Sequence, residues 1–244
     1  MGKKGPSRHM KRHMSPKFWP IHRKAAAWAV KPRPGPHGAE VSIPLIVVLR
    51  DFLGYAKTSK EARMLIHQGK VLVDGIPRKD PRYSVGLMDV VEIQDSGESF
   101  RVLPEHGGRF ILHNIPQREV EFKLCRIVGK TTMNGGKTQL NLHDGRNLIL
   151  ENGSSAYSVN DILKIHLPDQ EIIEKIEFKA GVRTIITGGR SQGQYGILMG
   201  LGTEPGKKKT AMIRTSENED VRTLSEYVFA VGTESSIISL PGGM

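Results

Sequence analysis

Apolar residues recur at helical spacing in one part of the chain, residues 42–69. The first helix predicted there stops at Gly54. Its apolar positions, three or four residues apart, are Leu45, Val48, Leu49 and Phe52. A second helix is predicted to begin after Thr58, because Glu61 stands three residues later and completes a capping box. Gly69 is its expected stop, so the pattern predicts two helices in close succession.

Most of the remaining chain shows the alternation and turn residues of β-structure. Val71 and Val73 precede an Asp74-Gly75 turn, which predicts a hairpin, and residues 90–93 predict a further strand. Short apolar runs then alternate with Gly, Asn and Asp. The strands that these runs predict are 110–112, 122–128, 140–142, 147–150 and 162–165. Strands of this length and spacing favour a small antiparallel sheet or barrel.

The N-terminal segment has a different character, since residues 1–39 contain ten Lys or Arg and no acid. The whole chain carries +11, so this segment holds +10 and the other residues only +1. A basic arm in front of folded modules is therefore predicted. Alanines favour a short helix over residues 24–30, and prolines make residues 32–38 a stiff linker. Trp19 and Trp28 suggest that the arm orders against a partner, by stacking on bases or packing on protein.

Charge and composition narrow the class of protein. An isoelectric point near 9.8 indicates a polyanionic partner, either nucleic acid or an anionic membrane. No run approaches 18 apolar residues, so a membrane span is not expected. Cys125 is the single cysteine, which leaves no intrachain disulfide, and its apolar strand pattern predicts a buried thiol. The histidines are scattered, and two Gly-Lys-Thr segments lack the first glycine of a phosphate-binding loop. We therefore predict no metal, cofactor or small-molecule substrate.

One segment of about fifty residues resembles the S4-type RNA-binding module, which recurs in ribosomal protein four, pseudouridine synthases and tyrosyl-tRNA synthetases. The residues that carry the resemblance are Leu53, Ala56, Thr58–Arg63, Ile66, Gly69–Gly75, Pro81, Val85–Gly86 and Asp89–Val90. In that family the start of the second helix and the turn after it face RNA. The resemblance thus implies RNA contacts at Lys57, Ser59, Lys60, Arg63, His67 and Lys70. Their spacing puts the last four on one side of the helix and its following turn, as a ridge along a phosphate backbone requires. Many members carry Arg where this chain has Lys60, so bidentate recognition is not predicted there.

Two further segments resemble parts of one ribosomal family. Residues 143–147 are similar to the middle domain of small-subunit ribosomal protein four of the archaeal and eukaryotic type. Residues 178–198 resemble the KOW motif, in which two strands flank a Gly-rich basic loop within an SH3-like barrel. Arg183 and Arg190 are the cations that this segment could present to phosphates. Residues 203–219 are predicted to form a loop with a basic cluster at 207–209, and residues 221–231 a closing strand.

The order of these parts matches that ribosomal family along nearly the whole chain. The resemblance implies an α+β, multi-module chain. Its expected parts are a basic extended arm (1–41), a small α/β S4-type module (42–94), a mainly-β central domain (95–174) and an SH3-like KOW barrel (175–244). The implied role is a cytoplasmic, non-enzymatic constituent of the small ribosomal subunit. Its expected partners are small-subunit ribosomal RNA and neighbouring ribosomal proteins, without a membrane.

Positive charge is expected to bind RNA by releasing its condensed counterions. The arm residues predicted to contact RNA are Lys3, Lys4, Arg8, Lys11, Arg12, Arg23 and Lys24. A rival reading is an RNA-modifying enzyme, but the Arg-Leu-Asp segment of pseudouridine synthases is absent. A free-standing RNA chaperone is the other alternative, and the long acid-free arm favours a permanent place in ribosomal RNA over it.

Overall fold

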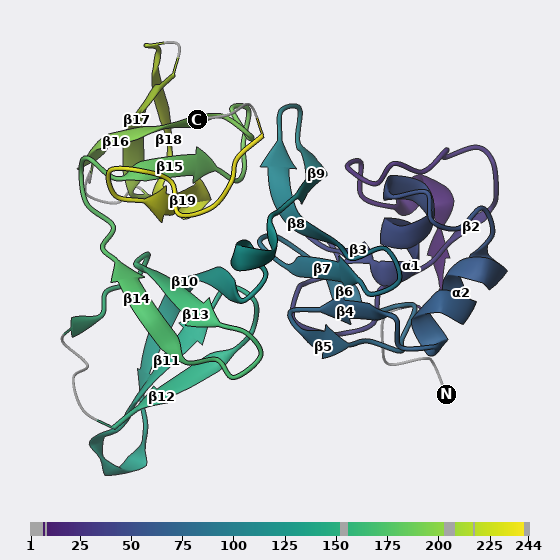
Figure 1. Ribbon diagram of the computed structural model, residues 1–244. Coiled ribbons are helices and arrows are strands. Elements are labelled where there is room, and N and C mark those ends of the chain that lie inside the picture. Colours follow the sequence, from purple (N-terminus) through teal and green to yellow (C-terminus); the bar gives the residue numbers. More distant parts are fainter. Residues whose placement is uncertain (1–6, 8, 152–155, 203–207, 217, 242–244) are drawn as a thin grey trace, which may run out of the picture.

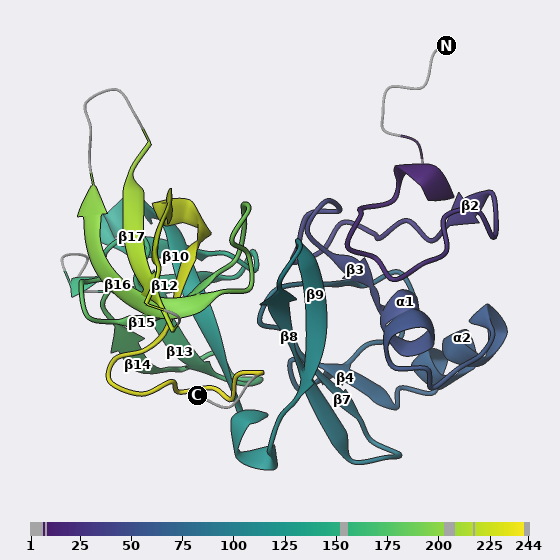
Figure 2. The ribbon, with the colours of Figure 1, turned by 90° about the horizontal axis from the view of Figure 1, so that it is seen from above.

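The computed structural model describes residues 7, 9–151, 156–202, 208–216 and 218–241. The chain is mostly β, and its described strands form three five-stranded antiparallel sheets and two short two-stranded ones. The second and third large sheets lie on one side of the molecule, and the first sheet lies on the other side with both α-helices (Figures 1 and 2). Among the described residues, no helix combines the length and the apolar character that crossing a bilayer requires.

The helices lie where the apolar spacing predicted them. The first is α1 (Leu45–Val47), which continues as a π-helical segment, Val48–Phe52. The second is α2 (Ser59–His67), whose capping box is present. The backbone N–H of Glu61 donates to Thr58 Oγ1 at 3.2 Å, and Glu61 Oε2 accepts from the backbone N–H of Thr58 at 3.3 Å. The cap satisfies N–H groups that the first turn of a helix leaves without partners.

The first large sheet has the strand order β5-β4-β7-β8-β9. Its strands are β4 (Val71–Val73), β5 (Ile76–Pro77), β7 (Val90–Ile93), β8 (Glu98–Glu105) and β9 (Arg109–Asn114). A two-stranded pair, β3 (Ile43–Pro44) with β6 (Ser84–Val85), flanks it. The expected module boundary at residue 94 falls between β7 and β8, which are hydrogen-bonded along four residue pairs. The sheet itself therefore runs on to Asn114.

The N-terminal arm packs against the first sheet and its helices. Its strands β1 (Met10–Lys11) and β2 (Trp28–Ala29) pair with each other, and its Trp19 belongs to the core that contains α1 and α2. The predicted helix over residues 24–30 is therefore wrong. An isolated seven-residue helix is marginal in water, whereas β2 gains a pairing partner and a core to pack on. Packing on protein thus orders the described part of the arm.

The second sheet has the order β12-β11-β10-β13-β14. Its strands are β10 (Phe122–Thr132), β11 (Thr138–Leu142), β12 (Asn147–Leu150), β13 (Ile162–His166) and β14 (Ile172–Ile176). The predicted strands of this region all lie in it except 110–112, which belongs to β9 of the first sheet.

Short 3₁₀ turns occur along the described chain, at Arg12–Met14, Gln117–Glu119, Asn134–Gly136 and Ser225–Tyr227.

The third sheet has the order β18-β17-β16-β15-β19. Its strands are β15 (Arg183–Ile186), β16 (Tyr195–Gly202), β17 (Thr210–Thr215), β18 (Asp220–Leu224) and β19 (Val228–Gly232). The loop predicted over residues 203–219 is wrong in part, because β17 lies within it. Ala211 and Ile213 face the core of this sheet while Met212 is exposed, which is the alternation of a half-buried strand.

The three sheets meet in one apolar cluster. It joins Met88 from the turn before β7, Leu103 from the first sheet, Leu124 from the second, and Ile185 and Phe229 from the third. The Gly-rich loop before β16 packs on the first sheet as well. Gly193 has a φ of +85°, and a Cβ there would collide with the backbone of Glu105 and His106 at the end of β8. Close contact thus fixes the modules against one another.

Candidate nucleic-acid interface

A groove of about 570 Å³ runs between the arm, α2 and the segment that connects β5 to β6. Five of its nine lining residues are basic or histidine, namely Arg33, Arg63, His67, Lys79 and Arg82. The apolar lining is Val30, Ile46 and Pro81, and Asp80 is the one acid. A concave surface with this charge suits a polyanion.

Three separate segments of the chain supply the basic and histidine side chains of the groove. Arg63 and His67 are four residues apart on α2, so they lie one above the other on its exposed side. Arg33 comes from the arm, whose backbone is tied to the connecting segment. The Arg33 N–H donates to the Arg82 carbonyl at 2.8 Å, and Arg82 Nε donates to the Lys31 carbonyl at 2.9 Å. The groove therefore exists only because the arm folds back onto the module.

The single acid does not neutralise the groove. Asp80 Oδ2 accepts from Arg33 Nη1 at 2.8 Å, and its Oδ1 accepts from the Arg82 backbone at 2.9 Å. Both carboxylate oxygens thus fix the shape of the groove. Arg63 and Lys79 are exposed and form no ion pair among the described residues, so their charges face solvent. An RNA phosphate could replace the counterions that such side chains carry in water.

Two arm arginines that were predicted to contact RNA are already hydrogen-bonded to the arm itself. Arg23 donates from Nη1 to the His13 carbonyl at 2.9 Å and from Nη2 to the Ser15 carbonyl at 3.0 Å. Arg12 Nε donates to the His22 carbonyl at 2.5 Å. An irregular arm leaves carbonyls without ladder partners, and guanidinium groups satisfy them. Lys11 and Lys24 stay exposed, whereas Lys3, Lys4 and Arg8 lie outside the described residues.

The predicted residues around α2 also divide into exposed side chains and side chains already bonded within the protein. Lys57 and Lys60 are exposed around the start of α2. Ser59 Oγ accepts from Arg50 Nη1 at 2.5 Å, and Lys70 forms an exposed ion pair with Asp95 at 2.7 Å.

Arg183 and Arg190 belong to the third sheet and the loop that follows β15, and neither lines the groove. Arg183 Nε donates to the Glu234 carbonyl at 2.8 Å, and Arg190 is exposed.

Arg33, Lys79 and Arg82 were missing from the predicted set. For Lys79 and Arg82 the available signal was the basic run around Asp80-Pro81, directly after the predicted hairpin, and for Arg33 it was the positive charge of the arm. The proximity of that run to α2 and the arm became visible only in three dimensions.

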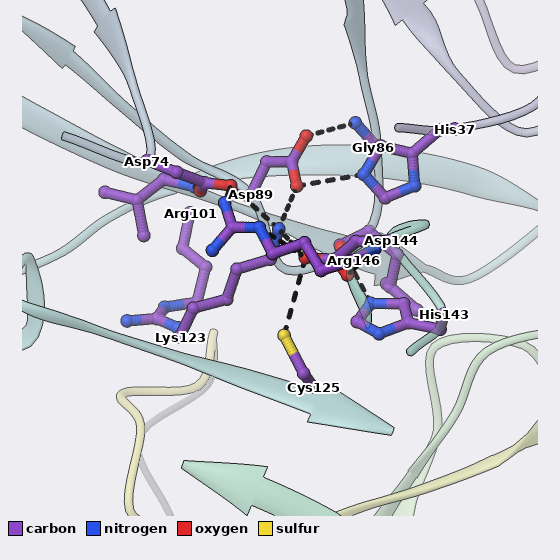
Figure 3. A network of polar contacts seen from close by, with 12 residues as sticks. His37, Asp74, Gly86, Asp89, Arg101, Lys123, Cys125, His143, Asp144 and Arg146 are labelled. Carbon is purple, nitrogen blue, oxygen red and sulfur yellow. Dashed lines mark hydrogen bonds and ion pairs between the residues drawn. The ribbon is translucent and has the colours of Figure 1, made fainter. Parts of the chain in front are cut away.

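A second polar cluster lies at the junction of the modules and is buried (Figure 3). Lys123 of β10 is fully buried and contacts three carboxylates. Its Nζ lies 2.9 Å from Asp74 Oδ2, 2.5 Å from Asp89 Oδ1 and 3.1 Å from Asp144 Oδ2. Arg146 adds a second cation, with Nη2 at 2.6 Å from Asp74 Oδ2. Buried charges of opposite sign compensate one another here, as the low polarity of the site requires.

The arm also reaches this cluster. His37 Nε2 lies 2.9 Å from Asp89 Oδ1, and Asp89 Oδ2 accepts from the Gly86 N–H at 2.8 Å. A Cβ on Gly86 would collide with the His37 imidazole, so glycine lets the arm enter. Burial alone would raise the pKa of Asp89, but His37 and Lys123 outweigh it and hold that pKa well below its usual value.

The chemistry of the cluster is that of a structural ion network. Burial lowers the pKa of Lys123, but the three carboxylates outweigh it and raise that pKa well above normal, so the ammonium stays charged. Burial also raises the pKa of the Cys125 thiol well above its usual value and lowers the pKa of His143 to about 3. At neutral pH the thiol and the imidazole are therefore uncharged, and no side chain here is an activated nucleophile or base.

Cys125, His143 and Asp144 are the one group in the described residues with the spacing of metal ligands. The cations beside Asp144 are Lys123, at 3.1 Å, and Arg146, whose Nε lies 3.2 Å from the same oxygen. The positive charge that a metal ion would supply to this carboxylate thus comes from the side chains of Lys123 and Arg146.

Comparison with known proteins gives matches along the chain. The ribosomal family S4e profile matches residues 96–172, the S4 domain matches residues 43–91, and the RS4NT domain matches residues 4–40. Small ribosomal subunit protein eS4 of Methanothermobacter thermautotrophicus is 47% identical over 97% of both chains. The protein of the same name from Methanosphaera stadtmanae is 43% identical over 99% of both.

A solved structure also resembles the fold. It is the crystal structure of the 30S ribosomal protein S4e from Thermoplasma acidophilum, which superposes with a TM-score of 0.68 at 30% identity. The match covers 79% of this chain and 95% of that one.

Proposed function

This chain belongs to the eS4 family of small ribosomal subunit proteins, and from that premise we propose that its basic groove binds small-subunit ribosomal RNA. The protein is a structural constituent of the small subunit in the cytoplasm, acting in translation and subunit assembly without catalysing a reaction. The observation that carries the RNA proposal is the set of five cationic or histidine side chains around one groove, whose single acid is already hydrogen-bonded.

The groove suits the sugar–phosphate backbone of RNA. Its cations come from three elements and are presented around a concave surface, which favours contact with several phosphates over recognition of one base. Arginine can hold a phosphate through two parallel hydrogen bonds, and Arg63, whose guanidinium forms no ion pair among the described residues, is the groove arginine best placed to do so. Arg33 and Arg82 already donate to Asp80 and to the Lys31 carbonyl, and add positive charge beside it. Of the residues predicted from sequence, Lys60, Arg63 and His67 extend the same positive surface along α2.

The other modules of the chain would position the RNA-binding groove within the small subunit. We propose an S4-type module next to the arm, a central β domain, and a C-terminal SH3-like KOW barrel built on the third sheet. Support for the barrel comes from the Gly-rich loop between β15 and β16, with Gly189 and Gly193 at positive φ. The loop packs on β8, and Gln192 Nε2 donates to the Arg109 carbonyl at 3.1 Å, so the loop is held against the first sheet.

The test compares two triple variants with the same loss of charge. Arg33→Ala, Arg63→Ala and Lys79→Ala together remove three groove cations. Lys137→Ala, Lys179→Ala and Lys208→Ala remove three exposed lysines that lie elsewhere, each paired with a surface acid. Affinity for refolded small-subunit ribosomal RNA is measured by filter binding between 50 and 400 mM KCl.

The groove variant should bind more weakly, and the slope of log affinity against log salt should fall by about two to three units, since each phosphate contact contributes roughly 0.7–0.9. The control should change the slope by less than one such contact. Equal slopes for both variants would remove the groove from the RNA interface. Sedimentation with small-subunit particles then reports whether incorporation follows affinity.

A further inference from the structure

The two tryptophans of the chain occupy opposite environments within the arm. Trp19 is 4% exposed, and its indole N–H donates to the Ser42 carbonyl at 3.0 Å, so it anchors the arm to the core. Trp28 is 58% exposed, although it lies only nine residues further along the same arm. A large aromatic side chain left in solvent by the fold is a candidate binding residue, because tryptophan otherwise gains much from burial.

The local backbone fixes Trp28 in its outward position. In the β1–β2 pair, Met10 lies opposite Ala29 and Lys11 lies opposite Trp28. Met10 and Ala29 pack against the core, and side chains alternate along a strand, so Lys11 and Trp28 share the outer face. The imidazole of His9 lies against the indole, with ring centroids 5.8 Å apart and planes at 59°. The ring is therefore held before any partner binds, which reduces the entropy lost on binding.

The surroundings of the ring are cationic. Lys11 is its cross-strand neighbour, and Lys24 is exposed on the chain that leads into β2. From residue 9 onward, no acid occurs in the arm before Glu40. Val30, two residues after Trp28, already lines the basic groove, and two residues of extended chain span about 7 Å. The indole thus stands beside the surface to which the phosphates are assigned.

We propose that Trp28 is a stacking platform for an unpaired base of ribosomal RNA whose backbone lies in the adjoining basic groove. This inference rests on the proposed RNA-binding function and adds a base contact to it. An indole face next to cations is the arrangement by which single-stranded RNA is bound, with the base on the ring and its phosphates on lysines. A protein partner would need an acidic face to complement the arm's positive charge, whereas any RNA brings negative phosphates to it.

The test uses intrinsic fluorescence, since the chain contains only these two tryptophans. In the Trp19→Phe variant all tryptophan emission comes from Trp28, and in Trp28→Phe all of it comes from Trp19. Each variant is titrated with refolded small-subunit ribosomal RNA, with single-stranded poly(A), and with poly(A)·poly(U) duplex at equal phosphate concentration. Binding is followed in parallel by filter retention.

Stacking should quench most of the Trp28 emission with the ribosomal RNA and with poly(A), and little of it with the duplex, while Trp19 emission stays unchanged. Trp28→Ala should weaken ribosomal RNA binding by about 5- to 150-fold, and Trp28→Phe should retain most of the affinity. Unchanged Trp19 emission in Trp28→Ala shows that the arm remains folded.

The outcomes separate this inference from the function on which it rests. Full RNA binding with unquenched Trp28 and an unaffected Trp28→Ala variant would overturn the platform and leave the groove intact. Equal quenching by single strand and duplex would also overturn it, because a paired base cannot stack on the ring. Absence of RNA binding by the unsubstituted protein would overturn both.

Discussion

Replacing Lys123 with methionine tests how the modules are held together. The substitution removes one buried ammonium that contacts Asp74, Asp89 and Asp144, and keeps a side chain of similar length. Arg146 would remain on Asp74 and Asp144, whereas Asp89 would keep only His37 and a backbone N–H. The substitution thus leaves the network with one more uncompensated buried negative charge than the unsubstituted protein has.

Breaking a buried ion pair from one side costs about 3–5 kcal/mol, because the charge left behind has no solvent. Protein stability is typically about 5–15 kcal/mol, so the loss would be a large share of it. For a chain of this size, each kcal/mol lowers the melting temperature by about 2–4 °C, which gives a fall of about 6–20 °C. Circular dichroism at pH 7 during heating and urea titration would measure both quantities.

The matched control is Lys137→Met, which breaks the exposed ion pair with Glu151 at 2.9 Å. Such surface pairs contribute at most about 1 kcal/mol. The double variant Lys123→Met with Asp89→Asn should recover part of the lost stability, since it removes the uncompensated charge. If Lys123→Met melted within error of the control, the buried network would not stabilise the junction and the electrostatic argument would fail.

Two further outcomes follow from local features. Thr58→Ala should lower the free energy of unfolding by about 0.5–2 kcal/mol through loss of the α2 cap, whereas Thr58→Ser should be close to the unsubstituted protein. Urea titration measures this free energy, and an equal loss in both variants would contradict the capping account. The pKa of His143 is lowered from its usual value of 6.5 to about 3, chiefly by burial and then by Lys123, so the folded state favours neutral imidazole. The stability that this contributes is complete above pH 6.5 and is lost as pH falls towards 3, so melting temperatures between pH 7 and 4 should fall less steeply for His143→Asn than for the unsubstituted protein. Parallel profiles for the two proteins would assign the acid sensitivity to other groups.

The features that the sequence determined by itself are local ones. The two helices and their capping box depend on spacings of three and four residues, and the strands at 71–73, 90–93 and 147–150 follow from short patterns and turns. The association with RNA could be read from the excess of positive charge and from motif resemblance. These signals can be recognised in the sequence because their physical causes act between residues that are near neighbours in the chain.

Only the tertiary structure decided which charged residues far apart in the sequence come into contact and which stay exposed. Lys123 lies in a predicted strand as an ordinary polar residue, and only folding brings it to carboxylates 49 and 34 positions earlier in the chain. The arm was expected to be extended or locally helical and to order against a partner, but the sequence did not show that burial of Trp19 would fold it onto the first module and create the groove with Arg33. The same packing buries one tryptophan and exposes the other. Whether a charge or ring faces solvent depends on long-range packing, which residue type and spacing do not specify.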